Sequence, residues 1–310
     1  MFQKLLLPIE GGEASKAIVR FAKKLAAPRA SARVMNVIVN ETTMFYADLL
    51  SLDHLTEAAT AMLEETVAEF SSPEFHLDHV LHQGTVDDCV REEIESYEPD
   101  LVVMGSHGRK GLQRLLLGSE VTRVMRHTTK PICIVKGDAA QRPGPLSRIA
   151  LATDLGEATS AAREAFVGLL RTAKAAGRSL HGDVIHVFES DPWFLPSSIV
   201  AVPGGGYSLP IVTSEVEKRI AERRREIEAE LGEITKPWRD EGLDVTTHML
   251  EGQAWDRLAD FVERERVDLL VLGSHHYGSF DRLMLGSIAE KTLRAVDCPV
   301  LLLPSPEAND

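Results

Sequence analysis

The sequence contains little cysteine, few aromatic residues and less positive than negative charge. Its three cysteines, Cys89, Cys133 and Cys298, show no Cys-x-x-Cys spacing, which predicts neither a disulfide framework nor a zinc cluster and favours a reducing compartment. Aromatic residues make up 5% of the chain, so few rings are available to stack on single-stranded bases. The formal net charge is -13. A general binder of nucleic acid is therefore not expected.

Long apolar runs are also missing. None approaches the roughly 18 residues that would predict a membrane span, and the first residues, MFQKLLLPIEGG, lack the basic and apolar segments of a signal peptide. We therefore expect a cytoplasmic protein without a membrane partner. The 310 residues, 44% of them hydrophobic, suffice for about two domains of about 150 residues, each with an aliphatic core.

The chain contains an internal repeat. Residues 100–136 and 268–304 align without a gap at an offset of 168, and 13 of the 37 positions are identical. The openings, LLLPIEGGEAS from Leu5 and IALATDLGEAT from Ile149, align at an offset of 144. Because the two offsets differ by 24 residues, the second copy carries an insertion, which we place at about 189–212. Such a repeat indicates two units of the same fold.

Each copy alternates short apolar runs with segments of helical spacing. In the first copy the expected strands are 4–9, 33–39, 75–82, 100–105 and 131–135, and the expected helices are 13–27, 53–70, 85–98 and 118–128. In the second copy the charged run 214–236 forms the second helix. This alternation predicts an α/β fold of two tandem Rossmann-like (HUP-type) domains, at 1–140 and 145–310, each a parallel sheet with helices on both faces. The Pro- and Gly-containing segment 136–147 is the expected linker.

Ligands in open parallel sheets bind beyond the carboxyl ends of the strands, so the loop after the fourth strand is a candidate binding loop. In the first copy it reads GSHG at 105–108, then nine residues, then GS at 118–119. Glycine lets a phosphate approach the backbone. The helix that Ser119 opens directs its first-turn amides and positive dipole end at an anion. Three cations lie in the same loop: Arg109, Lys110 and Arg114.

These glycine loops, the prolines before each last strand, Pro131 and Pro299, and the acid after each first strand resemble the universal stress protein family over essentially the whole chain. The resemblance implies a five-stranded parallel sheet in each half and a role in stress tolerance. It also implies an internal pseudo-dimer that pairs through the last strands, at 131–135 and 299–303. One branch of the family binds ATP, whose adenosine lies near an acid after the first strand and near the second strand. The nucleotide-binding residues implied for the first copy are Glu10, Val37, Met104, Gly105, Gly108, Arg109, Gly118 and Ser119.

Each copy departs from the family pattern at one point. Glu10 stands where the family more often has Asp, and in the second copy His276 replaces the glycine that corresponds to Gly108. An imidazole would stand there where a phosphate should pass. We therefore expect ATP, with or without Mg²⁺, in the first copy. A weaker second site would use Asp154, Gly273, Gly286 and Ser287.

The expected function is a stress-response regulator or sensor that binds an adenine nucleotide. No carboxylate pair, metal cluster or catalytic triad has suitable spacing, so no catalytic residue is expected and any ATP hydrolysis would be slow. The alternative is a tandem adaptor that acts through contacts with a protein partner, with the glycine loop kept for its turn. The apolar insertion 189–212 suits a lid over the second site, a contact with a partner, or a loop packed on its own domain. A homodimer of the whole chain also stays open.

Overall fold

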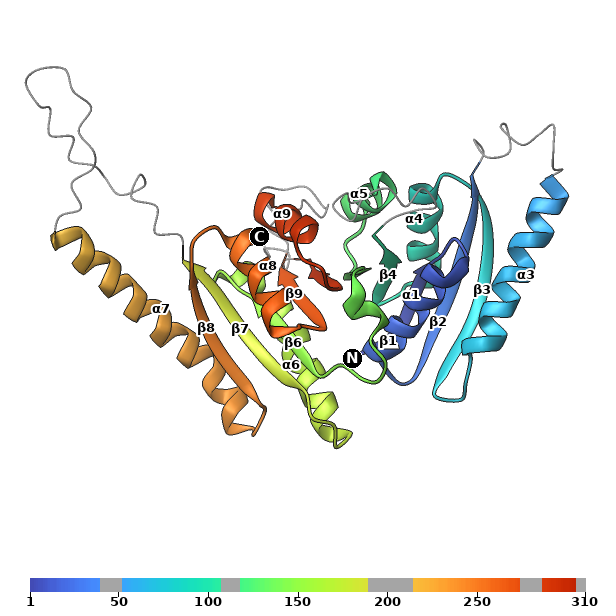
Figure 1. The fold of residues 1–310 in the computed structure, drawn as a ribbon. Helices are drawn as coiled ribbons and strands as arrows, with labels where there is room; N and C mark the ends of the chain where they lie inside the picture. Colours follow the sequence, from blue (N-terminus) through green and yellow to red (C-terminus); the bar gives the residue numbers. More distant parts are fainter. Residues whose placement is uncertain (40–51, 107–117, 189–213, 274–285, 305–310) are drawn as a thin grey trace, which may run out of the picture.

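Each copy of the repeat supplies five strands and four helices to the part of the chain that the computed structural model describes, residues 1–39, 52–106, 118–188, 214–273 and 286–304 (Figure 1). The first copy forms β1 (Phe2–Pro8), α1 (Gly12–Leu25), β2 (Ala26–Val39), α3 (Leu52–Phe70), β3 (Phe75–Gly84), α4 (Val86–Tyr97), β4 (Leu101–Gly105), α5 (Ser119–His127) and β5 (Ile132–Val135). The second forms β6 (Arg148–Ala152), α6 (Ser160–Ala175), β7 (His181–Phe188), α7 (Ser214–Asp240), β8 (Val245–Glu251), α8 (Ala254–Glu265), β9 (Leu269–Gly273), α9 (Ser287–Ala295) and β10 (Val300–Leu303). Two short 3₁₀ turns, η1 (Asp138–Gln141) and η2 (Glu157–Thr159), complete the set.

All ten strands lie in one sheet, in the order β3-β2-β1-β4-β5-β10-β9-β6-β7-β8. Within each copy the neighbouring strands are parallel, whereas β5 and β10 pair antiparallel. These two strands lie at the segments that the family resemblance places between the halves. The sheet therefore continues from one copy into the other through their last strands.

Two hydrophobic cores lie on opposite faces of this sheet. In β1, Leu5 and Leu7 belong to the core that α1, α3, α6 and α7 cover, whereas Leu6 belongs to the core under α4, α5, α8 and α9. All three leucines are fully buried, because successive side chains of a strand point to opposite faces and both faces carry helices. The expected α/β fold of two tandem Rossmann-like domains is confirmed.

Several element boundaries differ from the expectation, most of them by one or two residues, and the largest difference is that β2 begins at Ala26 and not at 33. Helix α1 ends at Leu25 and not at 27, and Ala26 already has extended backbone, because the residue before Pro28 is disfavoured in a helix. In the second copy α7 continues past Pro237 to Asp240, beyond the expected end at 236. The ring of Trp238 lies 6.0 Å from that of Phe166, and this packing holds the last turn of α7 against α6.

A half-buried lysine crosses the seam between the copies. Lys136, directly after β5, donates a 2.7 Å hydrogen bond from Nζ to the carbonyl of Leu293 in α9. Burial lowers the pKa of this amine. The next residue, Gly137, has φ +71°, and a Cβ at this position would collide with the backbone carbonyl of Asp297. Glycine at 137 therefore permits the close approach of the linker to the second copy.

We expect Gly137→Ala to destabilise the protein by about 2 kcal/mol or more, because strain at positive φ and a backbone collision add together. The matched control is Gly144→Ala. Gly144 also has positive φ, +82°, but nothing lies within 4 Å of its added Cβ, so its cost should stay near 1 kcal/mol. Urea unfolding followed by circular dichroism measures both variants. Equal destabilisation would show that the Asp297 contact is unimportant.

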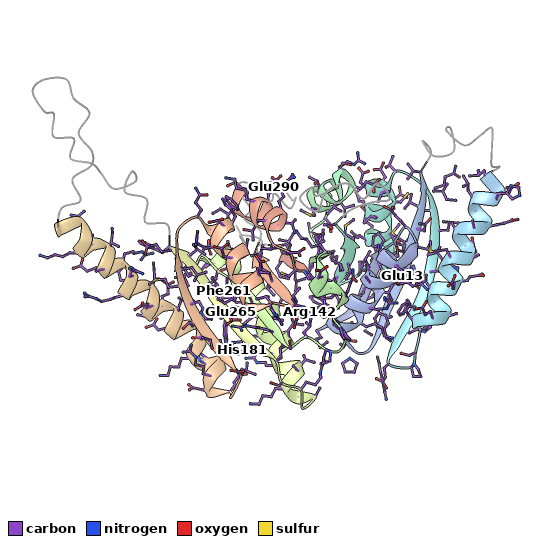
Figure 2. All side chains as sticks on the ribbon, in the orientation of Figure 1. Glu13, Arg142, His181, Phe261, Glu265 and Glu290 are labelled. Atoms are coloured by element: carbon purple, nitrogen blue, oxygen red, sulfur yellow. The ribbon has the colours of Figure 1, made fainter. Side chains whose placement is uncertain are left out.

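The linker is also fastened to both copies by charged side chains. Arg142 lies between the halves (Figure 2) and donates to the carbonyl of Arg266 at 2.7 Å and to the carboxylate of Asp268 at 2.8 Å. Lys24 of α1 donates to the backbone carbonyl of Arg142. The linker segment thus contacts both halves directly.

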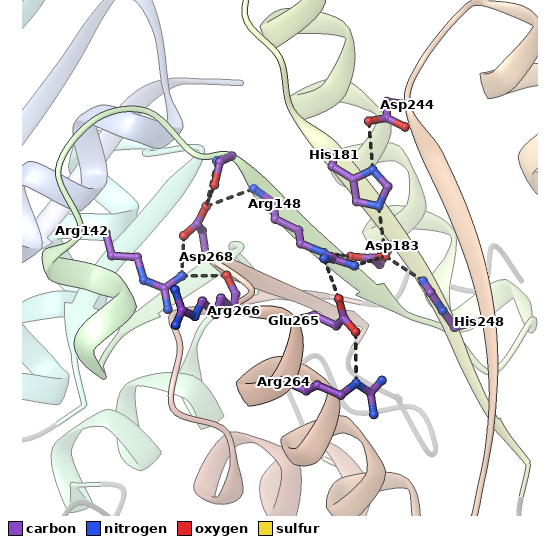
Figure 3. A network of polar contacts seen from close by, with 11 residues as sticks. Arg142, Arg148, His181, Asp183, Asp244, His248, Arg264, Glu265, Arg266 and Asp268 are labelled. Carbon is purple, nitrogen blue, oxygen red and sulfur yellow. Dashed lines mark hydrogen bonds and ion pairs between the residues drawn. The ribbon is translucent and has the colours of Figure 1, made fainter.

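An ion cluster is buried in the second copy, around the fully buried carboxylate of Asp183 on β7 (Figure 3). Arg148 of β6 contacts both oxygens, at 2.6 and 3.1 Å, and His248 of β8 lies 2.8 Å from one of them. His181 is 3.2 Å from the same oxygen, and Glu265 is 2.7 Å from Arg148. The cluster satisfies a charge that would otherwise be costly to bury.

This cluster predicts a loss of stability in acid. Burial alone would raise the pKa of Asp183, but hydrogen bonds from His248 and Arg148, together with the charge of Arg148, lower it to about 2. Because the folded pKa lies below the unfolded value, the stabilisation is complete above about pH 4 and is lost as the pH falls through 2. It amounts to about 2 kcal/mol. As the pH is lowered from 4 to 2, the free energy of unfolding should fall less steeply for Asp183→Asn than for the wild type. The same slope in both proteins would contradict the assignment.

Candidate functional site

The first candidate site lies at the carboxyl ends of β1, β2 and β4. β1 pairs with β2 on one side and with β4 on the other, so the strand order reverses there, which is where ligands bind in such sheets. Glu10 follows β1, Val37 lies near the end of β2, and Gly105 ends β4. Three of the expected residues, distant in sequence, therefore lie at one edge of the sheet.

A short glycine turn holds Glu10 at this edge. Gly11 and Gly12 have φ values of +99° and +75°, which glycine adopts without strain. The hydroxyl of the buried Ser15 accepts hydrogen bonds from the amides of Glu10 at 3.2 Å and Gly11 at 2.8 Å. This serine therefore fixes the backbone of the turn, while the side chain of Glu10 is exposed at the surface.

Val37 and Met104 differ in what they offer a ligand. Val37 is half-buried, so part of its side chain faces the surface. Met104 is only 5% exposed and packs in the core beneath α4 and α5. We therefore expect Met104 to contact a ligand through its backbone alone.

The two ends of the glycine loop are hydrogen-bonded to each other. The amide of Ser106 donates to Val135 at 3.2 Å, and the amide of Gly118 donates to the carbonyl of Ser106 at 3.0 Å. These bonds place the start of α5 beside the end of β4. Gly108 and Arg109, as well as the other two loop cations, Lys110 and Arg114, lie outside the described residues.

Helix α5 begins at Ser119, as expected, with an N-cap that has no side chain. Gly118 takes this position with φ -58° and ψ 145°, and the helix has no side-chain cap hydrogen bond. Ser119 itself is exposed. Because the first-turn amides of a helix lack partners within the helix, an end of this kind is suited to an anion.

The corresponding edge of the second copy is arranged differently. Oδ1 of Asp154 accepts hydrogen bonds from the amide of Gly156 at 3.0 Å and from the hydroxyl of Thr159 at 3.3 Å. Leu155, between Asp154 and Gly156 in the sequence, has φ +70°, a backbone conformation that is strained for a residue with a side chain. Asp154 therefore stabilises its own turn, a role that the repeat alone did not reveal.

The η2 turn lies against the end of β9. A Cβ built on Gly273 would approach the carbonyl of Ala158 at 3.0 Å and Cγ2 of Thr159 at 3.1 Å. Glycine at 273 therefore allows η2 to pack closely against the end of β9. Gly286 and Ser287 begin α9 with nearly the same geometry as in α5, φ -60° and ψ 151°. His275 and His276 lie outside the described residues.

The sequence alone did not single out two side chains that support the backbone near the candidate sites. Nδ2 of Asn36 donates to the carbonyl of Ile9 at 2.7 Å, and Nδ1 of His186 lies 3.0 Å from the carbonyl of Thr153. Each side chain thus holds the end of the first strand of its copy. The signal was a polar residue at the same place in the second strand of each copy, in RVMNVI and DVIHVF.

The described residues contain no group of three or more His, Cys, Asp or Glu side chains placed to hold a metal ion. Within the same ranges, no helix combines the length and apolarity that crossing a bilayer requires.

Comparison with known proteins identifies the family. Universal stress protein MJ0531 of Methanocaldococcus jannaschii is 31% identical over 92 residues, 30% of this chain and 52% of that protein. Universal stress protein Rv2005c of Mycobacterium tuberculosis is 27% identical over 209 residues, 67% of this chain and 62% of that protein. Each match thus covers less than two thirds of the relative's own length.

A solved structure shows the same fold over nearly the whole length. A universal stress protein from Archaeoglobus fulgidus has a TM-score of 0.67 at 21% identity, with 98% of this chain and 97% of that chain covered. The family model described as "Universal stress protein family" matches residues 1–136 and again residues 146–304. With a match in each half, the chain belongs to the universal stress protein family.

Proposed function

We propose that this universal stress protein binds an adenine nucleotide, ATP or another adenylate, at the carboxyl edge of its first copy and acts as a regulator or sensor. The observation that carries the proposal is the start of α5. Gly118 and Ser119 present an N-terminus without a side-chain cap, beside the ends of the strands where the order reverses. The phosphates would lie at this helix end, and Glu10 would lie near the ribose.

The first copy is the better candidate of the two because it keeps both glycines of GSHG at 105–108, whereas the second copy has His276 in place of the second glycine and a 3₁₀ turn at its edge. Asp154, the counterpart of Glu10, is engaged in its own turn, and η2 packs against Gly273. In the first copy α1 begins directly at Gly12 without such a 3₁₀ turn. We therefore expect one nucleotide for each chain.

The test is a calorimetric titration of Mg-ATP into the full-length protein, freed of any bound ligand by unfolding and refolding. We expect a micromolar dissociation constant, which corresponds to a binding free energy of about -8 kcal/mol, and a stoichiometry of about one. Stoichiometry of about two would show that the second copy also binds. No heat and no thermal shift would contradict the proposal and favour the adaptor, which acts through a protein partner without a nucleotide.

A further inference from the structure

A short series of hydrogen bonds leads from the candidate edge of the first copy to helix α9 of the second. The amide of Gly118, the N-cap of α5, donates to the carbonyl of Ser106 at 3.0 Å, and the amide of Ser106 donates to the carbonyl of Val135 at 3.2 Å. The next residue, Lys136, donates from Nζ to the carbonyl of Leu293 in α9 at 2.7 Å. Figure 1 shows α5 and α9 on the two sides of the seam between the copies. The start of α5 is therefore joined to α9 across this seam.

The lysine contact lies at the carboxyl end of α9. Leu293 is in the last turn of this nine-residue helix, where carbonyls lack partners within the helix and a donor or a cation is favourable. The hydroxyl of the neighbouring Thr292 is fully buried and has no hydrogen-bond partner among the described residues, which destabilises the same turn. A helix this short is stable only through tertiary contacts. We therefore expect the last turn of α9 to depend on Lys136.

The second copy cannot return this contact. At the offset of 168 the residue that corresponds to Lys136 is Pro304, and the residue of α5 that corresponds to Thr292 is Val124. Proline has neither a side-chain amine nor a backbone N–H to donate, and valine has no polar side-chain atom to leave unpaired. The link thus runs from the first copy to the helix of the second and has no equivalent in the other direction.

The backbone on both sides of Lys136 is closely packed. Val135 is buried and pairs with Gly105 of β4, the strand that ends at the candidate site. On the other side, a Cβ built on Gly137 would lie 2.4 Å from the carbonyl oxygen of Asp297, two residues beyond the end of α9. Because closely packed elements transmit strain, a shift at the end of β4 should reach Lys136 and, through it, α9.

We propose that Lys136 couples nucleotide binding in the first copy to the order of α9 in the second. The proposal rests on the proposed function, because it needs a nucleotide at the start of α5. A nucleotide there stabilises the arrangement of Gly118 and Ser106, and with it the position of Lys136 against Leu293. The last turn of α9 then opens less often, because the nucleotide binds more tightly to the state in which this contact is formed. The bound state of the first copy thereby reaches the second copy.

Hydrogen exchange followed by mass spectrometry tests the coupling in the full-length protein, with and without millimolar Mg-ATP. In the wild type we expect amide exchange in residues 288–296 to slow by about tenfold when the nucleotide binds. Strand β8, at the far edge of the sheet, is the internal control, and its exchange should change by less than about twofold.

Variants of the lysine test whether it is the link. Lys136→Met removes the donor and keeps most of the apolar side chain, so ATP should no longer slow exchange in α9. ATP should also bind about tenfold more weakly, because coupling between two events is reciprocal. Lys136→Arg keeps a charged donor and should restore part of both effects. The matched control is Lys130→Met. Lys130 precedes the opposite end of β5, where Ile132 pairs with Leu302 of β10, so this variant should behave like the wild type.

The outcomes separate the coupling from nucleotide binding. Unchanged exchange in α9 of the wild type, or equal slowing in α9 and β8, overturns the coupling even if Lys136→Met does not fold. Slowing that persists in a folded Lys136→Met also overturns it. In each of these cases, binding of ATP measured by calorimetry leaves the proposed function intact. Absence of ATP binding to the wild type overturns both.

Discussion

Gly118→Val should abolish nucleotide binding, weakening it by at least about 100-fold, with little change in the stability of the ligand-free protein. Gly118 has φ -58° and ψ 145°, a backbone conformation open to residues with a side chain, so valine adds no strain there. Its branched side chain would instead occupy the space before the first-turn amides of α5, where the phosphates are expected. Calorimetric titration of Mg-ATP measures the loss.

The chain contains a matched control for this variant. Gly286 begins α9 with φ -60° and ψ 151° and also lacks a side-chain cap. Gly286→Val therefore carries the same cost at a helix N-cap, under about 1 kcal/mol or a few degrees in Tm, but should bind ATP like the wild type. If both variants bind normally, the phosphates do not lie at α5. If Gly286→Val alone fails to bind, the site is in the second copy.

Arg148→Met should produce the largest loss of stability, about 3 kcal/mol. Arg148 supplies two hydrogen bonds to the buried carboxylate of Asp183, and methionine keeps the apolar part of the side chain but removes the charge. The carboxylate would remain buried with only His248 and His181 as partners. Removing one partner of a buried ion pair is costly because the other charge is left uncompensated. Urea unfolding at neutral pH measures the change.

Arg171→Met is the control for an arginine pair at the surface. Arg171 contacts Glu241 through two nitrogens, but the side chains are 56% and 42% exposed, so its loss should cost less than about 1 kcal/mol. Adding Asp183→Leu to Arg148→Met should recover part of the stability, since no charge is then left buried. Similar losses from both single variants would show that burial does not set the strength of the Arg148 pair.

The repeat also contains ion clusters of opposite polarity, which its pattern did not predict. In the first copy a cation, Arg33 on β2, contacts the carboxylates of Asp78 and Glu93 at 2.7 and 2.9 Å. In the second copy the cluster centres on an anion, Asp183 on β7, contacted by Arg148. Each cluster thus compensates its central charge with partners from its own copy.

Some repeated residues could be located from the sequence but not given a role. Asp100 and Asp268 are identical at the offset of 168. The structure shows that each accepts hydrogen bonds from backbone amides at the start of the first strand of its copy, with contacts of 2.7 Å to Gln3 and 2.8 Å to Ser147. The sequence shows only that this aspartate is repeated, and the folded chain shows that the two carboxylates fasten β1 and β6.

The sequence by itself determined the two copies, their strands and helices, the helix start at Ser119 and the residues that gather at the first edge. These follow from periodicity, glycine spacing and capping, which act over a few residues, and from the rule that parallel strands end at one edge. The tertiary structure alone decided that Asp154 holds its own turn, that Gly273 packs against η2 and that Lys136 joins the end of β5 to α9. These features depend on which side chains from separate elements come into contact, and packing across the sheet sets those contacts.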